Sequence, residues 1–176
     1  MMVKYYEDFT IGVEEAVGSH VVDKQEIIDY AIKWDPQPIH IDEEKAKNSD
    51  FKGLIAAGSH IFAISILIIN RWEYKVKAIA MLGMDEVKFK RAVCPGDVLS
   101  LTHKCIYKRE SENQKDRGII KNRIIIKNQR NEIVLTYIDI MLIAKSNRNE
   151  PVSKRPISAD LKRWAQISQE VTRSEA

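Results

Sequence analysis

The sequence predicts an α+β domain in which a curved antiparallel sheet wraps around one long buried helix. Residues 59–71 have a helical pattern that is apolar on nearly every side, and such a helix must be covered over most of its surface. Strand-like segments follow it in a row and are joined by short turns, which is typical of antiparallel pairing. A sheet that curves around the helix satisfies both observations, and this architecture is the hot-dog fold.

The first half of the chain is expected to supply the helices. Asp23 and Glu26 have the spacing of a capping box, in which each side chain bonds the backbone of the other, so a helix should begin after Asp23. It must end by Asp35, because Pro36 disfavours helical geometry in the residue before it. Asp42 is a good N-cap for a short helix. In chain order we expect a loop at 5–12, a strand at 13–22, the helix after Asp23, a short helix at 43–47 and the long helix at 59–71.

The second half is expected to supply the strands. An apolar segment at 78–84 leads into an alternating segment that contains Val87 and Phe89. The pair Pro95-Gly96 then signals a turn. The remaining strands are expected at 98–107, 118–128 and 133–144. The last of these is dense enough in apolar residues to predict a central position in the sheet.

Composition and charge exclude several classes of protein. The 176 residues suit one domain of ordinary size, and 44% hydrophobic with 30% charged residues is a normal globular mixture. A net charge of +3, with basic residues scattered among acidic ones, gives no basis for nucleic-acid binding. The longest apolar run, 61–69, is about half of the ~18 residues that span a membrane. Two cysteines and no visible N-terminal signal favour the cytoplasm.

The division of the chain follows from a change in composition. Residues 1–146 are expected to form a single hot-dog domain. Residues 147–176 are polar and contain Pro151 and Pro156 with basic residues between them. We interpret this last stretch as a tail or a peripheral helix packed on the domain, and not as a second domain.

The segment Asp35-Pro36-Gln37-Pro38-Ile39-His40 carries the residues best suited to chemistry. Its two prolines are expected to hold it as a stiff extended loop, which reduces the freedom that is lost when a carboxylate and an imidazole are aligned. Histidine titrates near neutral pH, and a carboxylate can orient it or serve as its complementary base. Gly58 follows at the start of the long helix, where free backbone N–H groups could polarise a carbonyl group as in an oxyanion hole.

These residues resemble a known family. The run from Asp35 to Asp42, the later Leu54-Ile55-Ala56-Ala57-Gly58 and the turn Cys94-Pro95-Gly96-Asp97 are similar to the signature of MaoC-like acyl dehydratases and (R)-specific enoyl-CoA hydratases. The resemblance covers most of the chain, from Tyr5 to Ala144. It implies a hot-dog fold and the reversible addition of water to a trans-2-enoyl thioester, usually enoyl-CoA, to give 3-hydroxyacyl-CoA.

The resemblance also implies the catalytic residues. Asp35 and His40 match the catalytic pair, which would bind one water molecule, and the sequence leaves open which of them removes a proton and which supplies one. Gly58 matches the glycine whose N–H polarises the thioester carbonyl. Each residue also has an ordinary interpretation: Asp35 could simply end a helix, His40 could be a loop histidine, and Gly58 could open the long helix with Ser59 as its cap.

Three further residues are expected to contact the substrate. Gln37 stands where the family commonly has Asn, and Ala57 stands where it often has His; Ser59 follows the glycine. These differences put the substrate preference in doubt more than the reaction. The resemblance implies no metal and no cofactor, because the CoA thioester is the substrate. It also implies a homodimer or higher homo-oligomer, since a single hot-dog domain leaves a sheet edge exposed.

Two other functions remain open. A hot-dog thioesterase would bind the same acyl-CoA but normally needs a carboxylate on the central helix, and residues 59–71 contain no Asp or Glu. A non-catalytic acyl-thioester-binding protein would keep the fold without turnover, although the presence of both Asp35 and His40 argues against it. Acyl chain length, the choice between CoA and acyl carrier protein, the pathway and the physiological direction do not follow from the sequence.

Overall fold

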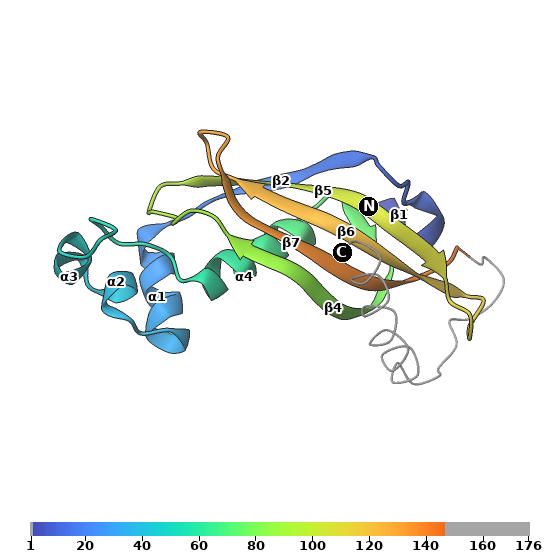
Figure 1. Cartoon of the computed structure of the whole chain (residues 1–176), viewed down its shortest axis with the longest axis horizontal. Helices are drawn as coiled ribbons and strands as arrows, with labels where there is room; N and C mark the ends of the chain where they lie inside the picture. Colours follow the sequence, from blue (N-terminus) through green and yellow to red (C-terminus); the bar gives the residue numbers. More distant parts are fainter. Residues whose placement is uncertain (1, 147–176) are drawn as a thin grey trace, which may run out of the picture.

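A computed structural model describes residues 2–146, and Figure 1 shows how the elements are arranged. The main sheet is antiparallel and has the strand order β2-β5-β6-β7-β4. The expected tail or peripheral helix at 147–176 lies outside the described residues. The elements, in chain order, are β1 (Met2–Lys4), a 3-10 turn η1 (Tyr6–Asp8), β2 (Glu14–Val21), α1 (Lys24–Trp34), α2 (Pro38–Ile41), α3 (Glu43–Lys47), α4 (Gly58–Asn70), β3 (Tyr74–Val76), β4 (Ala78–Phe89), β5 (Val98–Glu110), β6 (Arg117–Lys127) and β7 (Ile133–Ala144).

The long helix α4 lies against one face of the curved sheet, and this packing confirms the predicted hot-dog fold (Figure 1). Its residues Ile61, Ile64 and Ile68 are at most 3% exposed. They pack in one cluster with apolar side chains of β5, β6 and β7, such as Leu101 and Leu135. Burial of this apolar surface is the dominant favourable contribution to folding. Within the described residues, no helix is long and apolar enough to cross a membrane.

The sequence predicts the positions of the main strands but describes one of them as two separate segments. The apolar segment at 78–84 and the alternating segment after it are a single strand, β4, which pairs with β7 along its length. The pairing register shifts between Asp85 and Lys88, and Glu86 between them has a positive φ of 52°. Such a bulge interrupts the alternation of side chains, and for that reason the sequence pattern changes in the middle of the strand. As predicted, β7 is an internal strand, between β6 and β4.

A small parallel ribbon of β1 and β3 lies outside the main sheet and is not predicted by the sequence. Each of its strands has three residues, too few for a recognisable pattern. The segment after β1 is held to the sheet by Lys108 of β5, whose Nζ donates to the carbonyl groups of Tyr6 at 2.9 Å and Phe9 at 2.7 Å. The expected loop at 5–12 therefore contains an ordered turn, η1.

Two local expectations are wrong. The loop expected to be extended from Asp35 to His40 is extended only at its start, because Pro38–Ile41 form one helical turn with the proline at its first position. Proline suits this position, since its missing N–H would have no helical partner there. The capping box is also incomplete: Asp23 accepts from the backbone as expected, but the Glu26 side chain turns to His20 and His60 instead.

Candidate active site

Asp35 lies where α1 ends. Its N–H still donates to the Ala31 carbonyl at 2.9 Å, but its φ of −156° and ψ of 70° leave the helix. The Gln37 side chain donates through Nε2 to Asp35 Oδ1 at 2.9 Å. One carboxylate oxygen is therefore fixed by Gln37, and the other, Oδ2, is directed towards His40.

His40 lies on the single turn α2 and is 5% exposed. Its Nδ1 lies 2.8 Å from the carbonyl oxygen of Ile55. A carbonyl oxygen can only accept a hydrogen bond, so Nδ1 carries the hydrogen, and Nε2 of the neutral ring is left with its lone pair. The Ile55 N–H donates back to the Ile39 carbonyl at 3.2 Å, so the two segments fix each other and the orientation of the ring.

The two free atoms of this pair face each other across a gap. His40 Nε2 and Asp35 Oδ2 lie 3.8 Å apart. This separation is too long for a hydrogen bond but suits a water molecule between two polar groups. Both atoms are acceptors when His40 is neutral and Asp35 is a carboxylate, so a bridging water would donate one hydrogen to each.

Gly58 is the first residue of α4, and the residue before it, Ala57, gives the helix no side-chain cap. The earliest backbone bonds of the helix run from His60 and Ile61 back to Ala57, at 3.0 and 3.1 Å. The N–H groups of Gly58 and Ser59 precede these bonds and point out of the helix end, where the helix dipole is positive. This end of α4 can therefore receive a polarised carbonyl group.

The candidate residues lie on two segments that are held together. Ile55, which orients His40, is three residues before Gly58, so the bond between Ile55 and His40 ties the start of α4 to the Asp35–His40 segment. Gln37 and Ser59 are exposed, and Ser59 gives no side-chain cap to the helix. Ala57 is 1% exposed, so its methyl group packs in the interior and does not face solvent.

A second polar cluster lies beside α4 and does not include the Asp35–His40 pair. Glu26 accepts from His20 Nε2 at 2.9 Å and from His60 Nε2 at 3.1 Å, and the His60 ring stacks on Tyr30 with 4.5 Å between ring centroids. Burial raises the pKa of Glu26, but its bonds to the two histidines outweigh burial and hold the pKa below its usual value. Burial also lowers the pKa of His60. The cluster joins α1 to β2 and α4, and so positions the helix that ends at Asp35.

Two neighbours of the site are not identified by the sequence. Ile55 acts through its backbone carbonyl, and residue type gives no signal for that role. Phe89, at the end of β4, places its ring against Gly58, so that a Cβ atom at residue 58 would lie 3.2 Å from the ring. Phe89 is 51% exposed. The signal available in the sequence was its position in the alternating segment before the turn at Pro95-Gly96. Among the described residues, no cluster of three or more His, Cys, Asp or Glu side chains is arranged to hold a metal ion.

The family of the chain follows from comparison with known proteins. Residues 11–127 match the family described as MaoC like domain. The chain belongs to the MaoC-like dehydratase family. The matched range contains the Asp35–His40 segment, Gly58 and the sheet up to the end of β6. Membership of this dehydratase family supports an enzyme of hydro-lyase type.

The chain is also similar to individual proteins. The uncharacterized protein YdeM of Bacillus subtilis is 36% identical over 109 residues, which are 61% of this chain and 77% of that protein. The crystal structure of a MaoC-like dehydratase from Rhodospirillum rubrum has a TM-score of 0.75 and 27% identity, and covers 85% of this chain and 99% of that one. A β-methylmalyl-CoA dehydratase of Chloroflexus aurantiacus is 35% identical over 79 residues, which are 45% of this chain but only 22% of that enzyme.

Proposed function

We propose that the protein adds water reversibly to a trans-2-enoyl-CoA, giving a 3-hydroxyacyl-CoA. The observation that carries this proposal is the 3.8 Å gap between Asp35 Oδ2 and His40 Nε2, which suits one bridging water. Gln37 bonds the other oxygen of Asp35, and Ile55 bonds the other nitrogen of His40. Asp35 and His40 therefore each offer one acceptor atom to the water. The pair is thus prepared to bind and deprotonate a single nucleophile.

The proposed reaction balances without any other reagent. As the water oxygen bonds to the β-carbon, the Asp35–His40 pair takes one of the water protons, and the π electrons of the C=C bond move into the thioester to form an enolate. The pair then returns one proton to the α-carbon, and the carbonyl group is restored. Because the pair takes one proton and gives one back, nothing is oxidised or reduced and no cofactor is needed.

Gly58 is proposed to stabilise the enolate. The thioester oxygen would lie at the start of α4, where the Gly58 N–H is free of side-chain caps. A donor at this position stabilises charge that develops only in the transition state, which raises the rate and not simply the affinity. Glycine leaves room for the ligand to approach the backbone.

The CoA carrier is part of the proposal. It is supported by the similarity to the β-methylmalyl-CoA dehydratase, whose name specifies a CoA thioester, although the chain matches only 22% of that enzyme.

The protein is also proposed to act as a homodimer that pairs through β4. This strand is an edge of the main sheet and carries four apolar side chains that are each more than 40% exposed: Met81, Met84, Val87 and Phe89. Such an edge offers both free backbone groups and apolar surface to a second copy.

The test is hydration of crotonyl-CoA, followed by loss of the conjugated enoyl absorbance. We expect Asp35→Asn and His40→Gln each to lower kcat by about a hundredfold or more, because general acid–base catalysis contributes about 10²–10⁴-fold. Asp29→Asn is the matched control: Asp29 is an exposed carboxylate on the same helix, bonded to Gln25, and its loss should leave the rate unchanged. Wild-type rates in both site variants would contradict the mechanism.

The same incubation tests the thioesterase alternative. Hydrolysis would release free CoA thiol, whereas hydration leaves the thioester intact. Helix α4 from Gly58 to Asn70 contains no Asp or Glu that could activate water for hydrolysis. We therefore expect loss of enoyl absorbance without thiol release. Thiol release at a comparable rate would favour a thioesterase, and the absence of both signals would favour a binding protein.

A further inference from the structure

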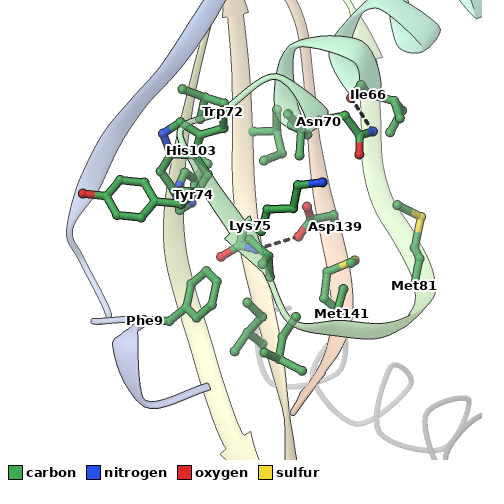
Figure 2. Close-up of a pocket in the computed structure, with 18 residues that line it drawn as sticks. Phe9, Ile66, Asn70, Trp72, Tyr74, Lys75, Met81, His103, Asp139 and Met141 are labelled. Atoms are coloured by element: carbon green, nitrogen blue, oxygen red, sulfur yellow. Dashed lines mark hydrogen bonds between the residues drawn. The ribbon is translucent and has the colours of Figure 1, made fainter. Parts of the chain in front are cut away.

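A cavity of about 270 Å³ lies at the far end of α4 from Gly58. Figure 2 shows it between the end of the helix, the β3 segment with Tyr74 and Lys75, and the sheet strand that carries Asp139 and Met141. Its walls are mainly apolar, and exposed residues such as Lys75 and Met81 stand at its rim. An engineered cavity of about 150 Å³ holds benzene, so a cavity of this size suits a ligand of on the order of ten non-hydrogen atoms.

Two buried polar side chains line this apolar cavity. Asp139 of β7 and Asn122 of β6 are 7% and 6% exposed, and Asn122 Nδ2 donates to Asp139 Oδ1 at 2.9 Å. Asn122 Oδ1 is buried and has no hydrogen-bond partner in the described part of the chain. None of the ion pairs found among residues 2–146 includes Asp139. Burial raises the pKa of Asp139 to about 6.

Buried acceptors without donors are costly, and natural proteins seldom retain them without a reason. The Asp139 carboxylate accepts hydrogen bonds from the side chain and the backbone of Asn122, so the acceptor left without a donor is Asn122 Oδ1. Both residues line one cavity whose surrounding groups are mostly hydrocarbon. Pockets that bind small molecules have this composition: apolar walls with a few placed polar groups that set orientation and specificity. What is missing is a donor, which a ligand can supply.

The cavity is separate from the Asp35–His40 site within one protomer. Tyr137, two residues before Asp139 on the same face of β7, bonds Ser65 of α4 through its hydroxyl group at 3.1 Å, and both residues are buried. The Phe62 ring packs on Tyr137 with 5.2 Å between centroids. This layer of side chains lies between the start of α4 and the cavity. Ile66, the first helix residue at the cavity, is eight residues from Gly58, or about 12 Å along the helix.

We infer that the cavity is a second ligand site, which binds an apolar group ending in a hydroxyl and fixes that hydroxyl through Asp139 and Asn122. The apolar body packs on the hydrocarbon walls of the cavity, and the hydroxyl donates to Asn122 Oδ1, which is buried and otherwise has no partner among the described residues. The inference does not depend on the proposed hydration reaction, because it rests on the cavity and its buried acceptors alone.

The test is direct binding of two probes of similar size. We expect 1-hexanol to bind the full-length protein, by calorimetry or by a rise in melting temperature, at least about tenfold more tightly than 1-chlorohexane, which lacks the donor; tenfold corresponds to ~1.4 kcal/mol. The double variant Asn122→Leu/Asp139→Leu should remain folded, because both partners of the hydrogen bond are replaced together. It should bind both probes alike.

Asp85→Asn on β4 serves as the control for these variants, because Asp85 does not line the cavity, and it should bind hexanol like the wild type. Equal binding of the two probes by the wild type, or no binding of either, would overturn the inference and leave the pair as the site of a buried water alone. An unchanged preference for hexanol in the double variant would overturn it as well.

A competition experiment identifies the source of the hydroxyl-bearing group. Pairing of two β4 strands in antiparallel fashion would bring the Phe89 end of one protomer beside the Ala78 end of the other, where the cavity opens. A long acyl chain bound at one active site could then reach the partner's cavity. Displacement of hexanol by a trans-2-dodecenoyl-CoA that carries a hydroxyl group on its terminal carbon, but not by crotonyl-CoA, assigns the cavity to the hydroxyl-bearing distal end of a thioester. Retention of hexanol with both assigns it to a separate small molecule.

Discussion

Asp35 and His40 each use one polar atom to bond a neighbouring residue and direct the other atom into the gap between them. Their positions are apparent from the sequence, because the spacing of the segment and its prolines is a local pattern. Their hydrogen bonds are not, because the Ile55 carbonyl reaches His40 only after the chain has folded back over 15 residues. The bond from Gln37 to Asp35 also depends on the turn of α2, which the sequence represented as extended. Residue type thus identifies the candidate groups, and folding sets their hydrogen-bond partners and direction.

At Gly58 we predict that replacement by alanine separates catalysis from stability. The added methyl group would lie 3.2 Å from the Phe89 ring, beside the free N–H groups at the start of α4. A contact of this length requires the ring to move by only a few tenths of an ångström, so the free energy of unfolding should change by less than about 1 kcal/mol. Hydration should slow by about tenfold or more, since the methyl group occupies the approach to the helix end.

Gly53→Ala is the matched control for Gly58→Ala. A Cβ atom there would have no other atom within 4 Å, and Gly53 lies in the same connecting segment before α4. Chemical denaturation and the crotonyl-CoA assay on both variants measure the two effects. Full activity in Gly58→Ala would argue that the helix end does not receive the thioester.

At the scale of elements, the sequence predicts best what depends on local periodicity. Helices α1, α3 and α4 and the strands β5, β6 and β7 lie within a few residues of their expected positions, and β7 at Ile133–Ala144 agrees at both ends. The sequence does not predict the ribbon of β1 and β3, because each strand forms only by pairing with the other, which is far away in the chain. The capping-box bond predicted for Glu26 is wrong for the same reason. The side chain bonds His20 and His60, which approach it only in the folded state.

The contact between η1 and β6 gives a prediction about stability. The Tyr6 ring packs on Gly118 so closely that a Cβ atom there would lie 2.3 Å from a ring carbon. The Tyr6 ring is also covered by Lys108, whose Nζ lies 4.3 Å from the ring centroid. We expect Gly118→Ala to displace Tyr6 and to lower the free energy of unfolding by about 1–3 kcal/mol, as overpacking usually does. Urea denaturation measures the loss, with Gly53→Ala as control; an unchanged midpoint would show that η1 adjusts without cost.

At the scale of the whole molecule, the sequence carries one signal of the cavity. Asp139 interrupts the otherwise apolar run Tyr137-Ile138-Asp139-Ile140 in an internal strand, and a charged residue in such a position requires an explanation. Alternation along β7 places it on the face towards α4, with Tyr137 and Met141. The fold can be predicted without an explanation for Asp139, because one residue does not change the periodicity of the strand. The cavity cannot be predicted from the sequence, because it depends on how the ends of α4 and β3 meet the sheet.

The raised pKa of Asp139 predicts how stability depends on pH. Its pKa increases from an ordinary 3.8 to about 6 in the folded state, so the folded protein holds the proton more tightly than the unfolded chain does. Protonation therefore favours folding, and stability from this group is lost as pH rises from about 4 to 6. A shift of about two units corresponds to ~3 kcal/mol. Asp139→Asn cannot ionise, so its free energy of unfolding relative to the wild type should increase by up to ~3 kcal/mol between pH 4 and pH 7.

Denaturant unfolding of Asp139→Asn and the wild type across this pH range measures the difference. Asp85→Asn is the control, since Asp85 pairs with Lys121 at 3.6 Å and a variant without that pair has no reason to gain stability with rising pH. Parallel stability curves for the wild type and Asp139→Asn would show that the carboxyl group is not desolvated in solution.

Association of two copies is a prediction about the largest scale, and the two edges of the sheet allow it to be tested. Both β2 and β4 are edge strands, but exposed apolar side chains are concentrated on β4. Met84 lies near the middle of that strand and is 41% exposed, so Met84→Lys places a charge where the second copy would pair. We expect sedimentation at micromolar concentration to show a dimer for the wild type and a monomer for Met84→Lys. Val21→Lys, at a 59% exposed position on β2, should stay dimeric. A monomeric wild type, or dissociation caused by Val21→Lys alone, would rule out pairing through β4, and the route from one active site to the partner's cavity would be lost with it.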